Sequence, residues 1–214
     1  DTVMRLERLP ASMLIVGGGF IAAEMGHAFS AFGTEVTIVQ RGPRLLMGED
    51  EAISTRFTDV AGRYLRVRVD SAVESVAPAA GGGVAVTVSG PDGSHVVEAE
   101  VLLLATGRRP NTDLLRVGEA GIEVDEHGHV VTDATGATTA EGVWSLGDLA
   151  NHFQLKHMAN AEARVITHNL LHPGRQRELP TGLAPHAVFA DPQVASVGLT
   201  EQQARAQGRD PVVA

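Results

Sequence analysis

The stretch from Ser12 to Gln40 constrains the fold more than any other part of the sequence. It reads as a short buried strand, Ser12–Val16, then three glycines, Gly17–Gly19, and then a helix that ends near Phe32, before Gly33. The apolar residues of this helix recur at the spacing of one helical face: Ile21, Met25, Ala28 and Phe32. A second apolar strand, Glu35–Gln40, follows, so the pattern predicts a βαβ unit and an α/β fold.

The glycine-rich turn carries a dinucleotide-binding pattern, Gly17-x-Gly19-x-x-Ala22. Glycines let the backbone approach a pyrophosphate, and the helix start at Phe20 and Ile21 supplies N–H donors and a positive dipole. The small Ala22 permits close packing of the helix on the strand. The same pattern occurs in ordinary tight turns, but the strand before it, the helix after it and the second strand favour a dinucleotide site.

The end of the second strand distinguishes NAD from NADP. An NAD site usually places an acid there for the ribose hydroxyls, whereas an NADP site has an arginine. This chain has Gln40 followed by Arg41, with Arg44 close by. A solvated loop arginine is the plain alternative, but the absence of an acid favours NADP over NAD.

The rest of the chain predicts further strands and helices. We expect a helix at Asp50–Ala61, a half-buried strand at Leu65–Val69, a hairpin of Val73–Val76 and Val84–Val88, a fully buried strand at Val101–Ala105, a buried strand at Val143–Leu146, a helix at His157–Leu171 and a short helix at Glu201–Gln207. The composition changes after Arg108-Arg109-Pro110-Asn111, and a third segment begins near Pro185.

Composition excludes several classes of function. The chain has no cysteine, and therefore no redox thiol and no thiolate metal site of its own. A formal net charge of −9 argues against a nucleic-acid or membrane partner.

His168 and His172 lie four residues apart on a predicted helix. No third ligand is near them and the other histidines are scattered, so we predict no metal site. Both ends of the sequence read as cuts within a longer protein.

Four ordered motifs resemble the class I pyridine nucleotide–disulfide oxidoreductases, which include glutathione, mercuric and mycothione reductases and dihydrolipoamide dehydrogenase. They are GGGFIAAE from Gly17, ATGRRPN from Ala105, TAEGVWSLGD from Thr139 and PHAVFADPQVASVGLTEQQA from Pro185. Among members, the segments DTVMRLERLP, FIAAE and QLKHMANAEARVITHNLL are most similar to mycothione reductase. The resemblance covers essentially the whole chain.

The resemblance implies roles that the residues alone do not reveal. Glu24 would pair with a lysine that lies beside the flavin and is missing from this chain. Val73 would lie near the adenine. Gly107 and Arg108 would close the nicotinamide side. Asp148 would bind the ribityl chain of FAD. A second set would place backbone N–H groups and a helix N-terminus against the flavin ring: Leu155, Lys156 and His157. NADPH members often carry a second arginine near the position of Met47, where Arg44 is the candidate replacement.

The implied architecture is a Rossmann-like NAD(P)-binding domain inserted in a FAD/NAD(P)-binding, glutathione reductase-like fold, truncated at both ends. We expect residues 1–111 to be the NADP-binding domain, 112–183 the C-terminal half of the FAD-binding domain, and 184–214 the start of an α+β dimerisation domain. The parent would be a cytoplasmic, homodimeric, NADPH- and FAD-dependent reductase of a low-molecular-weight disulfide.

No catalytic residue is assigned, because the redox cysteine pair and the His–Glu pair of the family are absent from this chain. The chain alone is therefore not expected to complete a turnover. An NAD-dependent dihydrolipoamide dehydrogenase and a noncatalytic nucleotide-binding module remain the alternatives.

Overall fold

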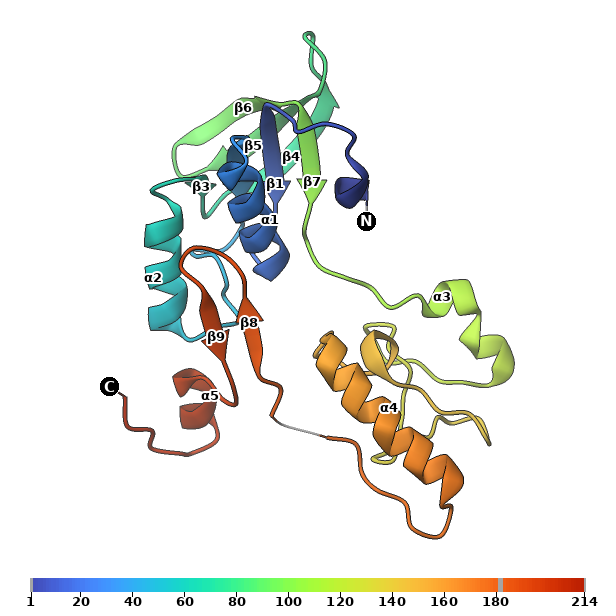
Figure 1. Cartoon of the computed structure of the whole chain (residues 1–214). Helices are drawn as coiled ribbons and strands as arrows, with labels where there is room; N and C mark the ends of the chain where they lie inside the picture. Colours follow the sequence, from blue (N-terminus) through green and yellow to red (C-terminus); the bar gives the residue numbers. More distant parts are fainter. Residues whose placement is uncertain (1, 181–182, 214) are drawn as a thin grey trace. The chain divides into compact units, whose positions relative to one another are not determined.

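The computed structural model describes residues 2–180 and 183–213. The chain divides into two compact units (Figure 1). The first unit comprises residues up to Gly107 together with those from Ala187 onward, and the second unit is Arg108–His186. The first unit contains η1 (Thr2–Arg5), β1 (Ser12–Val16), α1 (Phe20–Ala31), β2 (Glu35–Val39), α2 (Glu51–Ala61), β3 (Arg66–Arg68), β4 (Ala72–Pro78), β5 (Val84–Gly90), β6 (Gly93–Ala99) and β7 (Val101–Leu104).

The first unit is built in three layers around a parallel sheet of order β3-β2-β1-β7. Alternation along β1 sends Met13 and Ile15 to one face, where they pack with Phe57 of α2 and the small residues of α1. Leu14 points to the other face, where it packs against the antiparallel sheet β4-β5-β6. The predicted βαβ unit and the α/β class are confirmed.

Two predicted strands differ from the structure. The segment predicted as a fully buried strand at Val101–Ala105 is β7, which is only partly buried, with Leu104 68% exposed. The reason is that β7 lies at the edge of its sheet, a position the apolar composition does not reveal. The third strand of the antiparallel sheet, β6, was not predicted, because its exposed residues interrupt the apolar pattern.

The second unit consists of short helices and turns packed on α4 (Lys156–Leu171). The others are α3 (Thr112–Leu115), η2 (Val117–Ala120) and η3 (Gly147–Leu149). The buried strand predicted at Val143–Leu146 is wrong for this chain, since within the described residues it forms only one isolated bridge, Ala137 with Trp144. Without a neighbouring strand, an apolar run does not form a ladder, and Leu146 is 36% exposed.

From Ala187 onward, the C-terminal segment belongs to the first unit. It holds β8 (His186–Val188), β9 (Val194–Ser196) and α5 (Glu201–Ala206). The hydroxyl of Tyr64 donates to the carbonyl of Asp191 at 2.6 Å, and the N–H of Glu201 donates to Asp50 at 2.8 Å. These contacts connect the segment to both ends of α2.

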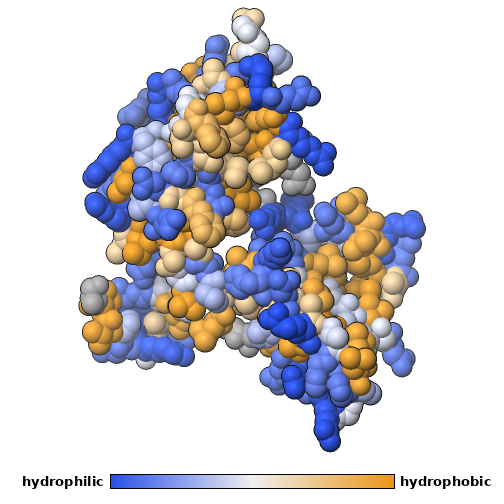
Figure 2. All heavy atoms as spheres, in the orientation of Figure 1, coloured by the Kyte–Doolittle hydropathy of each residue, from blue (hydrophilic) through white to orange (hydrophobic). Residues whose placement is uncertain are grey.

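Apolar side chains lie at the surface of both units (Figure 2). Leu104 is 68% exposed, Leu114 75% and Phe189 67%. Large exposed apolar areas are unusual on isolated soluble domains and often mark surfaces that contact other protein segments.

Candidate functional site

The glycine turn between β1 and α1 has the geometry that a pyrophosphate site requires. Gly17 has φ +117°, and a Cβ there would lie 2.3 Å from the carbonyl oxygen of Ala105, so only glycine fits. Gly19 is the N-cap of α1 and has no atom within 4 Å of its Cβ position, which leaves space for a ligand. Ala22 is fully buried against the sheet. The first turn of α1, which begins with Phe20 and Ile21, therefore faces the open space at Gly19, where a ligand can approach its N–H groups.

The end of β2 places a neutral amide beside this turn. A Cβ on Gly18 would lie 2.7 Å from Cδ of Gln40, so the Gln40 side chain lies over the glycines. Its amide nitrogen approaches the carbonyl of Arg44 at 3.4 Å. No carboxylate occupies the position that binds ribose hydroxyls in NAD sites.

The two arginines after β2 differ in their surroundings. Arg41 is exposed and has neither a hydrogen bond nor an ion pair within residues 2–180 and 183–213. Arg44 is largely buried, and its guanidinium pairs with Glu51 at 3.2 Å. Arg41 is therefore the arginine available to an incoming phosphate, whereas Arg44 would have to exchange an existing partner.

Three other sequence-predicted residues of the first unit are held in different ways. Val73 is partly buried in the cluster between the two sheets, so its side chain packs in the core. Glu24 accepts the N–H of Phe189 at 3.0 Å, which joins α1 to the C-terminal segment. Gly107 has φ +128° and open space around its Cβ position.

The second unit brings together most of the residues that the resemblance places around the flavin. Arg108 donates to Asp148 at 3.3 Å and to the carbonyl of Gln154 at 3.2 Å. Asp148 lies in η3 and is about half exposed. Leu155 is the N-cap of α4, which has no side-chain cap, and Lys156 and His157 form its exposed first turn.

Glu162 is a buried carboxylate beside the Asp148 loop that the sequence did not reveal. It lies on α4, is only 3% exposed, and accepts the N–H of Gly147 at 2.7 Å. It also accepts the side-chain amide of Asn151 at 2.8 and 2.9 Å. Glu162 therefore fixes the loop that presents Asp148. The burial of this carboxylate on α4 is seen only in the structure.

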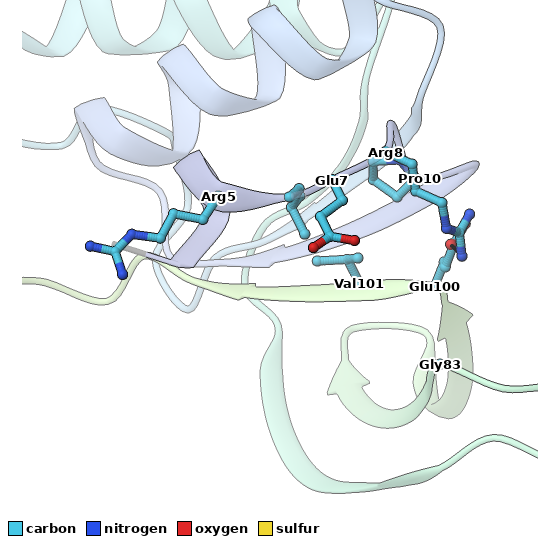
Figure 3. Close-up of a pocket in the computed structure, with 8 residues that line it drawn as sticks. Arg5, Glu7, Arg8, Pro10, Gly83, Glu100 and Val101 are labelled. Carbon is cyan, nitrogen blue, oxygen red and sulfur yellow. Dashed lines mark ion pairs between the residues drawn. The ribbon is translucent and has the colours of Figure 1, made fainter.

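A pocket of about 540 Å³ lies elsewhere, at the amino ends of β1 and β7. Arg8, which forms an ion pair with Glu100, lies on its wall with Val101 (Figure 3). Ligands of open parallel sheets bind at the carboxyl ends of the strands. We therefore do not place the nucleotide in this pocket.

Comparison with known proteins identifies relatives for nearly the whole chain. The profile described as pyridine nucleotide-disulphide oxidoreductase matches residues 1–163, and the dimerisation-domain profile of the same family matches residues 184–214. Mycothione reductase of Mycobacterium tuberculosis (strain H37Rv) is 46% identical, over 98% of this chain and 46% of its own length. Dihydrolipoyl dehydrogenase of Bacillus subtilis is 33% identical, over 99% of this chain and 45% of its own length.

A solved structure shows the same fold. The HOCl-induced flavoprotein disulfide reductase RclA from Escherichia coli has a TM-score of 0.85 at 30% identity, over 97% of this chain and 47% of that one. The chain thus spans about half the length of these relatives. Within the described parts of the chain, no helix is long and apolar enough to cross a bilayer.

Proposed function

The chain belongs to the pyridine nucleotide-disulphide oxidoreductase family, and we propose that it is the NADPH-binding part of an FAD-dependent reductase of a low-molecular-weight disulfide, of the mycothione reductase type. The observation that carries this proposal is the end of β2. There Gln40 lies over the glycine turn, and Arg41 follows without a partner in the described chain. The identity of 46% to mycothione reductase supports the choice of substrate class.

The first unit would bind the dinucleotide. Gly19 leaves open space at the N-terminus of α1, where N–H groups and the helix dipole stabilise a pyrophosphate. Arg41 would pair with the 2′-phosphate that distinguishes NADP from NAD. Gln40 would not repel that phosphate, because an amide carries no charge.

The second unit has groups that fit a flavin. Asp148 offers an exposed carboxylate for ribityl hydroxyls, and the uncapped first turn of α4 offers N–H groups to an electron-rich ring. Arg108 would hold Asp148 in place through their ion pair. When bound, FAD supplies the chemistry that passes electrons from the nicotinamide to a disulfide. The chain has no cysteine, so it does not itself supply the redox pair.

We extend the proposal to the domains and the assembly. Residues 1–111 would form the NADP-binding domain and 112–183 one half of an FAD-binding domain. In a longer protein, the other half would cover Leu146 and the exposed leucines at the end of α4, Leu170 and Leu171. Residues 184–214 match the dimerisation domain, which supports a homodimer. The protein would act in the cytoplasm.

Two alternatives are less well supported. An NAD-linked dihydrolipoyl dehydrogenase is consistent with the 33% identity to the Bacillus subtilis enzyme. However, an NAD site usually has an acid at the position of Gln40. A noncatalytic nucleotide-binding module would need neither the Asp148 loop nor a dimerisation segment.

Substitution of Arg41 tests the proposal. A charge-assisted hydrogen bond contributes about 1.5–3 kcal/mol, so Arg41→Ala should weaken NADP binding roughly 10- to 150-fold. NAD binding should change little. Calorimetry on the protein gives both dissociation constants. Arg56→Ala is the matched control. Arg56 is exposed on α2, and its substitution removes the same charge at a position away from β2. Tighter binding of NAD than of NADP by the unsubstituted protein would show that the cofactor is wrongly assigned.

A further inference from the structure

Three ligand-type side chains converge in the second unit, apart from the residues assigned to cofactors. Asp125 Oδ2 lies 3.5 Å from Nδ1 of His129 and 3.7 Å from Nε2 of His152. One donor atom from each residue lies within 4.8 Å of the other two. The imidazole rings of His129 and His152 meet edge to face, with centroids 4.3 Å apart.

His129 is buried without the partners that a core histidine normally has. The residue is 6% exposed, and neither ring nitrogen has a hydrogen-bond partner within the described chain. Buried polar side chains are nearly always hydrogen-bonded, so an orphaned imidazole calls for a physical explanation. A metal ion bonded to Nδ1 would satisfy the nitrogen that faces Asp125.

The carboxylate of Asp125 has one oxygen engaged in the local turn and one directed at the imidazoles. Oδ1 accepts the N–H groups of His127 and His129, each at 2.8 Å. Oδ2 lies 3.5 Å and 3.7 Å from the two imidazole nitrogens, so it is the carboxylate oxygen available to an ion.

We propose that Asp125, His129 and His152 bind a divalent transition-metal ion, with Zn²⁺ the best match. Two imidazole nitrogens and one carboxylate oxygen form a donor set that zinc accepts. A tetrahedral ion about 2.1 Å from each ligand separates the ligand atoms by about 3.4 Å. The separations from Asp125 Oδ2 are 3.5 and 3.7 Å, close to this value. His152 is 67% exposed in its side chain, which leaves the fourth position open to water and gives the ion a route of entry.

The ion would join two loops of the second unit. Asp125 and His129 belong to one turn, in which the N–H of Asp125 donates to the carbonyl of His129 at 2.8 Å. His152 follows Asn151, whose side chain is held by Glu162. Metal binding would therefore fasten the loop after Asp148 to the turn at Asp125. This inference does not depend on the proposed function.

The other close histidine pair is a weaker candidate. His168 and His172 stack with centroids 4.5 Å apart, but one ring nitrogen of each already contacts a backbone carbonyl, at 2.9 Å for His168 and 3.0 Å for His172. Within the described chain, no third ligand-type residue forms a cluster with them. The pair therefore serves as an internal control.

The test uses protein stripped with EDTA and titrated with Zn²⁺ by calorimetry, and with Co²⁺ followed by its visible absorption. We expect one equivalent to bind per chain, with the absorption bands of tetrahedral cobalt. His152→Ala removes an exposed ligand, and Asp125→Asn keeps an oxygen that accepts the turn N–H groups. Loss of an outer-shell partner already costs about 10- to 100-fold in metal affinity, so loss of either direct ligand should cost at least about 100-fold.

His172→Ala should bind Zn²⁺ as the unsubstituted protein does. Absence of Zn²⁺ and Co²⁺ binding by the unsubstituted protein would overturn the proposal. Unchanged affinity in both His152→Ala and Asp125→Asn would also overturn it, because any bound metal would then occupy another site.

Discussion

Replacing Glu162 by alanine should destabilise the second unit by about 2–4 kcal/mol. The carboxylate is 3% exposed and accepts one N–H from Gly147 and the side-chain amide of Asn151. Leaving a buried donor without an acceptor costs about 1–3 kcal/mol, so two donors give about 2–6 kcal/mol. We expect the lower part of that range, because Asn151 is only partly buried and its amide can turn to water.

The single tryptophan of the chain provides the assay. Trp144 lies in the second unit, so its fluorescence during urea unfolding reports on that unit. Glu162→Gln keeps one acceptor oxygen but turns an NH₂ group toward the donors, so it should lose about half as much stability as the alanine variant. Glu141→Ala is the control, because Glu141 is exposed and a surface substitution of this kind stays within about 0.5 kcal/mol.

A loss of less than about 1 kcal/mol in Glu162→Ala would refute the reasoning. It would mean that the loop carrying Asp148 is held by contacts other than the Glu162 carboxylate. A loss of similar size in Glu141→Ala would be equally damaging, because the effect would then follow from charge rather than from the buried hydrogen bonds.

Three further predictions concern other parts of the fold. Gly17→Ala should destabilise the first unit by about 3 kcal/mol or more in thermal unfolding, because φ is +117° and the new Cβ would meet a carbonyl oxygen at 2.3 Å. Gly19→Ala should show no such loss in the same measurement, because its Cβ position is open. Hydrogen bonds from a neighbouring threonine lower the pKa of Asp133, so the unfolded state binds more protons and the second unit should lose stability as the pH falls below about 4. Asp133→Asn should flatten this dependence in tryptophan-monitored unfolding, and an unchanged slope would contradict the assignment. Tyr64→Phe removes a 2.6 Å hydrogen bond to Asp191. The free energy of opening the C-terminal segment should fall by about 1 kcal/mol, which should speed its amide exchange about fivefold. Equal exchange rates would show that this contact does not hold the segment.

Local patterns in the sequence determined the elements whose formation depends on near neighbours. The run from Ser12 through the three glycines to Gln40 predicted β1, α1 and β2, because strand alternation, helical spacing and glycine turns are encoded over a few residues. The helix predicted at His157–Leu171 is α4, which begins one residue earlier, at Lys156. The ordered motifs also sufficed to assign the family.

Only the tertiary structure decided which of these elements meet. Apolar content indicated that Val101–Leu104 is a strand, but not that it would occupy a sheet edge and leave Leu104 exposed. The pairing of Arg108 with Asp148 joins residues far apart in the sequence. No periodic pattern encodes such contacts, because they depend on how loops from separate elements are brought together in space.

The same reason explains the histidines of the second unit. Along the sequence, His129 and His152 are scattered residues with no ligand spacing, and the sequence alone predicted no metal site. In the fold, the turn that starts at Asp125 and the loop before α4 bring both imidazoles to one carboxylate oxygen. The sequence determined the residue types and the local turns. Long-range packing determined that His129 is buried, with neither of its ring nitrogens hydrogen-bonded within the described chain.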